Sequence, residues 1–189
     1  MERVALGERN GPLLAPGIAA RGPRAPLRFR SVNAPGTPGY RQGMQRHHLL
    51  PRQLLAQGWF ARLADQVGGD QLGLDDFRAN GLLLPALEQA AQVLGLPLHR
   101  GPHRHYNQVV IERVGQIEAG WQCRRLQDPE RARTELVMRL RLLQRALRRN
   151  LLQPARALAR LNRHDPAWNT IDFSELDAMA EALWHASDT

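Results

Sequence analysis

The chain has 189 residues, which suits one domain with appendages or at most two small domains, and it carries a formal net charge of +8. All 26 basic residues are arginine, and this basic balance favours nucleic acid or an acidic partner over a neutral small molecule. The single cysteine excludes an intrachain disulfide, and no apolar run is long enough for a membrane span. Because no apolar secretory signal is found, we expect a protein that is made in the cytoplasm and leaves it, if at all, by a signal-independent route.

The first half of the chain predicts an arm followed by short elements. Residues 1–40 are rich in Pro, Gly and Arg without sustained periodicity, which predicts an extended or partly disordered arm. Apolar residues at three- and four-residue steps predict a helix over residues 51–67. An Asn-Gly turn signal at Asn80 precedes a short apolar run, and a helix is predicted over residues 85–95, where Gly95 ends it.

The second half predicts longer helices. One helix is expected from Pro102 to about Cys123, with Gly101 as its cap, and the next from Pro129 to about Arg149. Pro154 can start a further short helix, and Ser174 a last one. The helix over 129–149 has an apolar stripe of leucines and an opposite face of arginines: Leu136, Leu140, Leu143 and Leu147 against Arg141, Arg145 and Arg148.

Charge is unevenly distributed along the chain. Residues 124–163 hold twelve arginines against three acids, whereas residues 164–189 hold six acids and no arginine. We expect the acidic tail to pack on the arginine-rich segment rather than to mimic nucleic acid. For the arginine-rich segment itself, a core helix with a solvated face and a phosphate-binding surface remain open alternatives.

Five of the seven histidines fall into two clusters, His47–His48 and the group His99, His103 and His105. Neighbours on a strand point to opposite faces, so His47 and His48 are suited to different tasks. Histidine supplies neutral nitrogen ligands and a base that titrates near neutrality, and a hydrolytic metal site needs both. The Gly101-Pro102 turn can bring His99 back toward His103, with His47 as a third ligand and an open position for water.

Two alternatives belong to other functional classes. Cys123 could complete a closed structural zinc site in a non-catalytic binding protein, but it lies about twenty residues along the predicted helix from His103, roughly 30 Å at 1.5 Å per residue. The second alternative is a degenerate catalytic fold that has lost its activity and works only as a binding module. His164 and His185 are expected to be ordinary surface or core residues.

The order of three segments resembles a known family. "RHHLLP", "DDFRANGLLLP" and "LPLHRGPHRHYNQVV" are similar to the AHH group within the HNH/endonuclease VII superfamily, also called ββα-metal or His-Me finger nucleases, over about residues 41–118. The resemblance implies a small ββα-metal core, and with the helices predicted above we expect an α+β, mainly helical fold in which helices flank this core. The expected division is an arm (1–40), a nuclease core (41–123) and a helical C-terminal extension (124–189).

The resemblance also implies roles for individual residues. His48 would be the general base, Asn80 would orient it, and His47 would be a ligand or orienter. His99 and His103 match the later histidine pair that binds metal. The residues expected to contact substrate are Arg46, Tyr106, Arg100 and Arg104. Arg46 departs from the family pattern, because it stands where the family name has alanine.

The implied function is a metal-dependent endonuclease that acts on DNA more readily than on RNA. Water would attack the phosphodiester with His48 taking its proton, and a 5′ phosphate would result. The ion, one divalent cation, is left open among Zn, Mn, Ni and Mg. Many relatives are bacterial toxins, so an acidic immunity protein is an expected partner. The alternative is a non-catalytic nucleic-acid- or partner-binding protein with a structural metal site.

Overall fold

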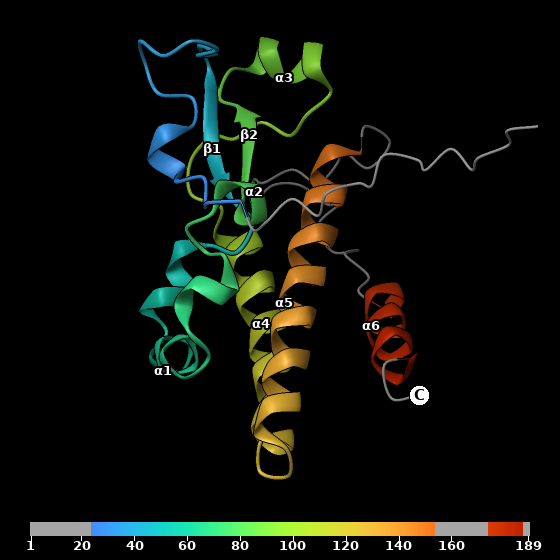
Figure 1. Cartoon of the computed structure of the whole chain (residues 1–189). Coiled ribbons are helices and arrows are strands. Elements are labelled where there is room, and N and C mark those ends of the chain that lie inside the picture. The colour runs from blue at the N-terminus through green and yellow to red at the C-terminus, as the bar shows by residue number, and fades with distance from the viewer. Residues whose placement is uncertain (1–23, 154–173, 187–189) are drawn as a thin grey trace, which may run out of the picture.

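A computed structural model describes residues 24–153 and 174–186 (Figure 1). Within these ranges the fold is mainly helical with one two-stranded antiparallel sheet, as predicted. Over the same ranges, no helix is both long enough and apolar enough to cross a membrane. The elements in chain order are η1 (Phe29–Ser31), β1 (Met44–His48), η2 (Arg52–Ala56), α1 (Gly58–Val67), η3 (Gly69–Leu72), α2 (Phe77–Asn80), β2 (Gly81–Pro85), α3 (Glu88–Leu94), α4 (Arg104–Arg124), α5 (Pro129–Leu152) and α6 (Ser174–Ala186).

The sheet pairs the histidine doublet with the start of β2. His47 lies opposite Leu82 and His48 opposite Gly81. A Cβ atom at Gly81 would clash with the ring of Phe77, so a larger residue at this position would have to displace that ring. The pleat of β1 turns the two histidines to opposite faces of the sheet, so each meets a different part of the molecule.

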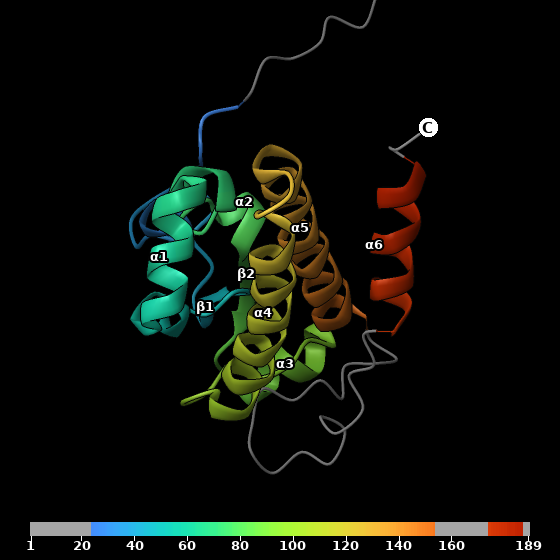
Figure 2. The same ribbon diagram turned by 90° about the horizontal axis from the view of Figure 1, so that it is seen from below.

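Helices α4 and α5 form a long antiparallel pair that carries most of the core (Figures 1 and 2). The predicted stripe on α5 is confirmed, since all four of its leucines are buried in one cluster with residues from α1, α4, β2 and the turn that follows β1. Asp128 caps α5 by accepting a hydrogen bond from the backbone N–H of Arg131, and Pro129 occupies the first turn. On the arginine face, Arg141 and Arg145 are exposed, whereas Arg148 donates to the carbonyl of Arg78 (2.8 Å).

Helix α6 lies beside α5 on the side away from α1, as Figure 2 shows from below. Its acids pair with arginines of the two long helices: Asp177 with Arg113, and Glu181 with Arg139. The expected packing of the acidic tail on the arginine-rich segment is therefore confirmed for α6. Arg139 also binds the buried Glu135 (2.6 Å), so a desolvated carboxylate is satisfied where the helices meet.

The predicted helix over residues 51–67 is divided in two. A 3₁₀ turn, η2, ends at Ala56, and α1 begins at Gly58. Gln57 between them has an extended backbone (φ −80°, ψ 115°) and caps both pieces. Burial of Leu54 and Phe60 in the same core fixes this bend, and the apolar spacing alone did not reveal it.

The starts of two later helices also differ from prediction. Pro85 belongs to β2, opposite Met44, so α3 begins only at Glu88; Gly95 ends it in a left-handed conformation (φ 60°), as expected. Helix α4 begins at Arg104 instead of Pro102 and has His103 at its N-cap. Helix α5 continues to Leu152, and the predicted helix at Pro154 lies outside the described residues.

Residues 24–32, part of the predicted arm, lie against the core instead of extending from it. Leu27 accepts a hydrogen bond from the N–H of Phe77 (2.7 Å) and donates its own N–H to Asp76 (3.0 Å). Phe29 is only 8% exposed. Long-range contacts with α2 and β1 order this segment, and no local periodicity signals them. Residues 1–23 lie outside the described residues, and the three-part division of the chain stays a prediction.

Candidate active site

Three histidines from different elements meet on one face of the sheet. His47 comes from β1, His99 from the segment after α3, and His103 from the N-cap of α4. Their ring centroids are 5.1 Å apart for His47–His99, 5.6 Å for His47–His103 and 4.4 Å for His99–His103. One ligand nitrogen from each ring lies within 4.8 Å of the others. The structure thus brings together the three residues predicted as metal ligands.

Backbone geometry explains why His99 reaches the cluster. Its N–H donates to the carbonyl of Pro85 (2.7 Å), which fixes the chain against the end of β2, and Gly101 turns it with φ 78° into α4. The Nδ1 of His99 contacts Oε1 of Gln45 at 2.9 Å. Because an amide oxygen only accepts, Nδ1 is the donor, and the neutral ring keeps a lone pair on Nε2.

Two imidazoles of the cluster, those of His47 and His99, are held in the neutral form that can bind a metal ion. Burial, with the nearby His99 and His103, holds the pKa of His47 well below its ordinary value. Burial and the neighbouring His103 lower the pKa of His99 to about 4. The Nε2 of His47 is buried and has no hydrogen-bond partner among the described residues. An unsatisfied buried nitrogen beside two half-buried imidazoles fits a divalent ion, so these three residues could hold one.

The lowered pKa values predict how metal-free stability depends on pH. On unfolding, His47 and His99 regain an ordinary pKa near 6.5, so the unfolded chain binds more protons. The free energy of unfolding should therefore be highest above pH 6.5 and fall as the pH drops toward 4. Each ring contributes at most about 1.4 kcal/mol per pH unit, less for the partly exposed His99. Urea unfolding in EDTA across this range measures the slope.

His99→Gln is the matched variant, because it keeps a polar side chain but removes one titrating group. Its stability should fall less steeply between pH 6.5 and 4 than that of the wild type. If the slope of unfolding free energy against pH were unchanged, His99 would bind protons equally in the folded and unfolded states over this range.

On the other face of β1, His48 borders a cleft of about 700 Å³. Four arginines line it together with one acid, Asp75, and the apolar side chains of Leu54, Leu55 and Leu74. The arginines come from three separate parts of the chain: Arg28, Arg30, Arg46 and Arg52. Such a surface suits a polyanion, because each guanidinium offers a planar pair of donors to phosphate oxygens.

Burial and two of these arginines favour the neutral form of His48. Burial is the largest cause of its lowered pKa, and the charges of Arg52 and Arg46 act in the same direction, opposed by Asp75. A neutral imidazole at neutral pH can accept a proton, which is the requirement for a general base. The doublet therefore presents a nitrogen ligand on one face and a candidate base in an arginine-lined cleft on the other.

Asn80 and Tyr106 both hold the chain that follows His48. Asn80 accepts from the N–H of Leu50 (2.7 Å) and donates to its carbonyl (3.1 Å), while its own carbonyl accepts from the N–H of Leu49 (2.8 Å). Tyr106 donates its hydroxyl to the carbonyl of Leu49 (2.6 Å) and is 1% exposed. The expected substrate contact of Tyr106 does not fit, because its ring and hydroxyl are buried beneath the site.

The three arginines predicted to contact substrate have different surroundings. Arg46 lines the cleft, but its Nη1 donates to the carbonyls of Phe29 (3.0 Å) and Val32 (3.4 Å). Arg100 is exposed and pairs with Glu88 (3.2 Å). Arg104 is exposed in the first turn of α4, next to His103.

The alternative zinc site with Cys123 is not supported. Cys123 is exposed in the last turn of α4, and the ligand cluster found among the described residues consists of histidines alone. The continuous helix separates Cys123 from His103, as the rise per residue predicted. If these three histidines bind an ion, they would leave coordination positions for water and substrate, as in an open site.

Several residues of the site were missed by the sequence analysis. Gln45 could have been found, because it stands two positions before His47 and so shares its face of the strand. The cleft residues Arg28, Phe29 and Arg30 could not, because they lie in a segment without periodicity and reach the site through long-range contacts.

The chain was compared with known proteins. A sequence model of AHH, described as a nuclease family of the HNH/ENDO VII superfamily with conserved AHH, matches residues 28–147. The match covers more than half of the chain, including both strands, the three clustered histidines and His48. Searches of curated proteins and of solved structures each found no significant match.

Proposed function

Because the chain belongs to the AHH nuclease family of the HNH/endonuclease VII superfamily, and is thus a phosphodiester hydrolase, we propose that it is a metal-dependent endonuclease with His48 as general base. The observation that carries this proposal is that the two neighbouring histidines of β1 lie in different surroundings on its two faces. His47 joins the ligand cluster with His99 and His103, while His48 borders the arginine-lined cleft on the opposite face.

The chemistry assigned to the chain's own residues begins at His48. Its neutral ring accepts a proton from the water that attacks the phosphorus. The P–O3′ bond breaks, the 3′ oxygen takes up a proton, and the products carry a 5′ phosphate and a 3′ hydroxyl. When bound by His47, His99 and His103, a divalent ion supplies a Lewis acid for the phosphoryl and leaving oxygens. Asn80 and Tyr106 hold the backbone after His48, so they position the base indirectly.

Nucleic acid is the substrate class of the family, and we assign DNA ahead of RNA. The four arginines of the cleft supply sequence-independent contacts of the kind that phosphate backbones take. Arg100 and Arg104 lie exposed near the metal ligands, where they can contact the same strand further along.

A toxin role follows from the resemblance to toxin-type nucleases, and it implies an acidic immunity protein that covers the basic cleft. The net charge of +8 supports an acidic partner of this kind. Expression in cells tests the role: the wild-type chain should arrest growth and a His48→Ala chain should not. Equal growth with both chains would remove this support.

The nuclease proposal is tested by incubating purified protein with supercoiled plasmid DNA and with RNA. We expect cutting with at least one of Zn²⁺, Mn²⁺, Ni²⁺ and Mg²⁺, faster on DNA, and none in EDTA. Binding of DNA without cleavage under every ion would favour the non-catalytic alternative. Cleavage that persists in EDTA would contradict the metal dependence.

A further inference from the structure

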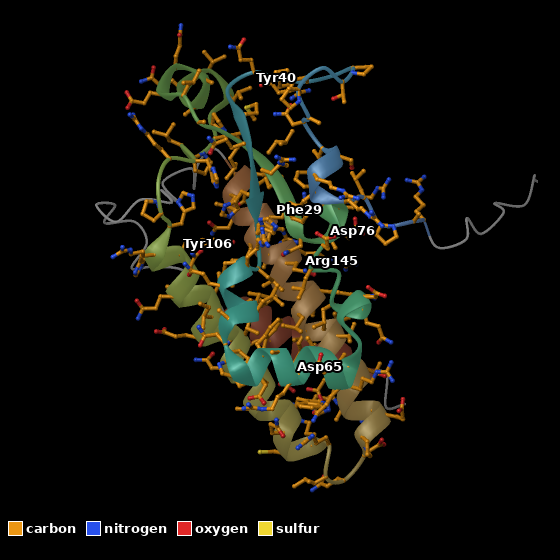
Figure 3. All side chains as sticks on the ribbon, turned by 90° about the vertical axis from the view of Figure 1, so that its left-hand side faces the viewer. Phe29, Tyr40, Asp65, Asp76, Tyr106 and Arg145 are labelled. Carbon is orange, nitrogen blue, oxygen red and sulfur yellow. The ribbon has the colours of Figure 1, made fainter. Side chains whose placement is uncertain are left out.

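The segment Leu27–Ser31 is fastened to the core on one side of the cleft. Asp76 accepts hydrogen bonds from the N–H groups of Leu27 and Arg78, both at 3.0 Å, and Arg28 forms a backbone bridge with Asp76. Arg46, from β1, donates to the carbonyl of Phe29 at 3.0 Å. Contacts from both α2 and β1 thus fix the segment next to His48. Figure 3 labels Phe29 and Asp76, which lie close together in this part of the molecule.

Phe29 lies directly on the ring of His48. The two rings are stacked, with centroids 3.8 Å apart and an interplanar angle of 2°. The other neighbour of Phe29 is Phe77, whose ring meets it edge-on at 5.1 Å. Phe77 in turn occupies the space left free by Gly81, directly opposite His48 in the sheet. A chain of aromatic contacts therefore runs from the sheet, through Phe77 and Phe29, to the plane of the imidazole.

The residues on either side of Phe29 point into the cleft. Arg28 and Arg30 both line it, together with His48. Burial of Phe29 between them holds two guanidinium groups at one wall, while Arg46 and Arg52 approach from the chain on either side of His48. A single short segment thus brings both an aromatic support for the candidate base and two cations.

We propose that the segment Leu27–Ser31 is a part of the active site, in which Phe29 is a positioning residue for His48 and Arg28 and Arg30 bind backbone phosphates. The inference rests on the proposed nuclease function. A stacked phenyl ring restricts rotation of the imidazole about its Cβ–Cγ bond, so the attacking water meets a preset nitrogen. This proposal also explains Arg46, because its side chain binds the carbonyl of Phe29, which an alanine could not do.

The positioning role is tested with Phe29→Leu and Phe29→Tyr. Leucine keeps an apolar side chain but has no flat face, so kcat on plasmid DNA should fall about 10- to 100-fold with KM and bound metal nearly unchanged. Tyrosine keeps the flat face and should restore most of kcat. Wild-type kcat in Phe29→Leu would overturn the positioning role, and so would an equal loss in both variants.

The stacking has a signature that does not depend on cleavage. The ring current of Phe29 should shift the ring protons of His48 upfield in the NMR spectrum of the metal-free protein. This shift should be lost in Phe29→Leu and kept in Phe29→Tyr. Identical His48 shifts in the wild type and Phe29→Leu would overturn the stacked arrangement, whether or not the protein cuts nucleic acid.

The phosphate contacts are tested by binding of a fluorescent duplex DNA to the metal-free protein in EDTA. The double variant Arg28→Gln/Arg30→Gln should bind about 10-fold more weakly. The slope of its log binding constant against log salt concentration should be shallower by the equivalent of up to about two phosphate contacts. Arg24→Gln/Arg41→Gln is the matched control, because it removes the same charge from exposed positions outside the cleft. Equal loss in both double variants would overturn the assignment of phosphate contacts to this segment.

These measurements separate the two proposals. If the wild type cuts no nucleic acid with any ion, the nuclease proposal fails and the positioning of a base fails with it. The binding comparison then still decides whether the segment contacts phosphate. If the wild type cuts but Phe29→Leu cuts equally well, only the positioning role fails.

Discussion

Replacing His48 by alanine should lower the rate of DNA cleavage about 10²- to 10⁴-fold, the range that a positioned general base contributes. The structure gives His48 both requirements of a base: an edge on the cleft where phosphate can bind, and a pKa that burial and the charges of Arg52 and Arg46 hold below its ordinary value. Because His48 lies on the face of β1 opposite the ligand cluster, its removal should leave metal content unchanged. Single-turnover cleavage and metal analysis of the same preparation measure both effects.

His185→Ala is the matched control, because this exposed histidine lies in α6, away from the cleft. It should cut at the wild-type rate. A further variant, His48→Gln, keeps a polar side chain of similar reach but cannot take a proton, so it should be as slow as His48→Ala. Substantial cleavage by both His48 variants would assign the base to another residue.

The histidine doublet shows what sequence alone can predict. Alternation along a strand required His47 and His48 to face apart, and the structure confirms this on β1. The convergence of His99 and His103 also followed from local features, because the turn at Gly101 lies between them. Such local rules, with the family resemblance, were enough to predict the three ligands as a group.

The wall of the cleft could not be predicted in this way. Phe29 lies 19 residues before His48 in a segment rich in Pro, Gly and Arg, where no periodicity marks a buried side. Its position depends on Asp76 and Arg46, which bind the backbone of the segment from two separate elements. Because the segment makes these hydrogen bonds through its backbone, they leave no pattern in its own side chains, and composition alone predicted an arm.

The roles of the polar residues near His48 were also hidden by burial. Tyr106 was expected to contact substrate and Asn80 to orient the base; both are 1% exposed and hold the chain at Leu49 and Leu50. A buried polar side chain must find partners inside the protein, and the backbone after β1 supplies them. Whether such a residue meets substrate or scaffold depends on burial, which a sequence pattern does not give.

Replacing His47 by leucine should have opposite effects on metal binding and on metal-free stability. The variant should lose stoichiometric metal and cleavage, because the cluster is left with His99 and His103. In EDTA, however, it should be about 1 kcal/mol more stable than the wild type, because the buried Nε2 of His47 has no partner among the described residues and leucine fills similar space without that cost. Metal analysis and urea unfolding with and without the ion measure both effects.

His103→Ala separates metal loss from this burial effect. It should also lose the metal, but His103 is only half-buried, so its removal should not stabilise the metal-free protein. With free ion at about 100 times its Kd, the wild type should gain roughly 2.7 kcal/mol that neither variant gains. A metal-free His47→Leu protein less stable than the wild type would mean that Nε2 is satisfied in solution, and retention of metal by both variants would place the ion elsewhere. The expected result is that the buried Nε2 of His47 lowers stability until an ion binds it. This result would show that His47 serves to bind the ion and does not serve to pack the core.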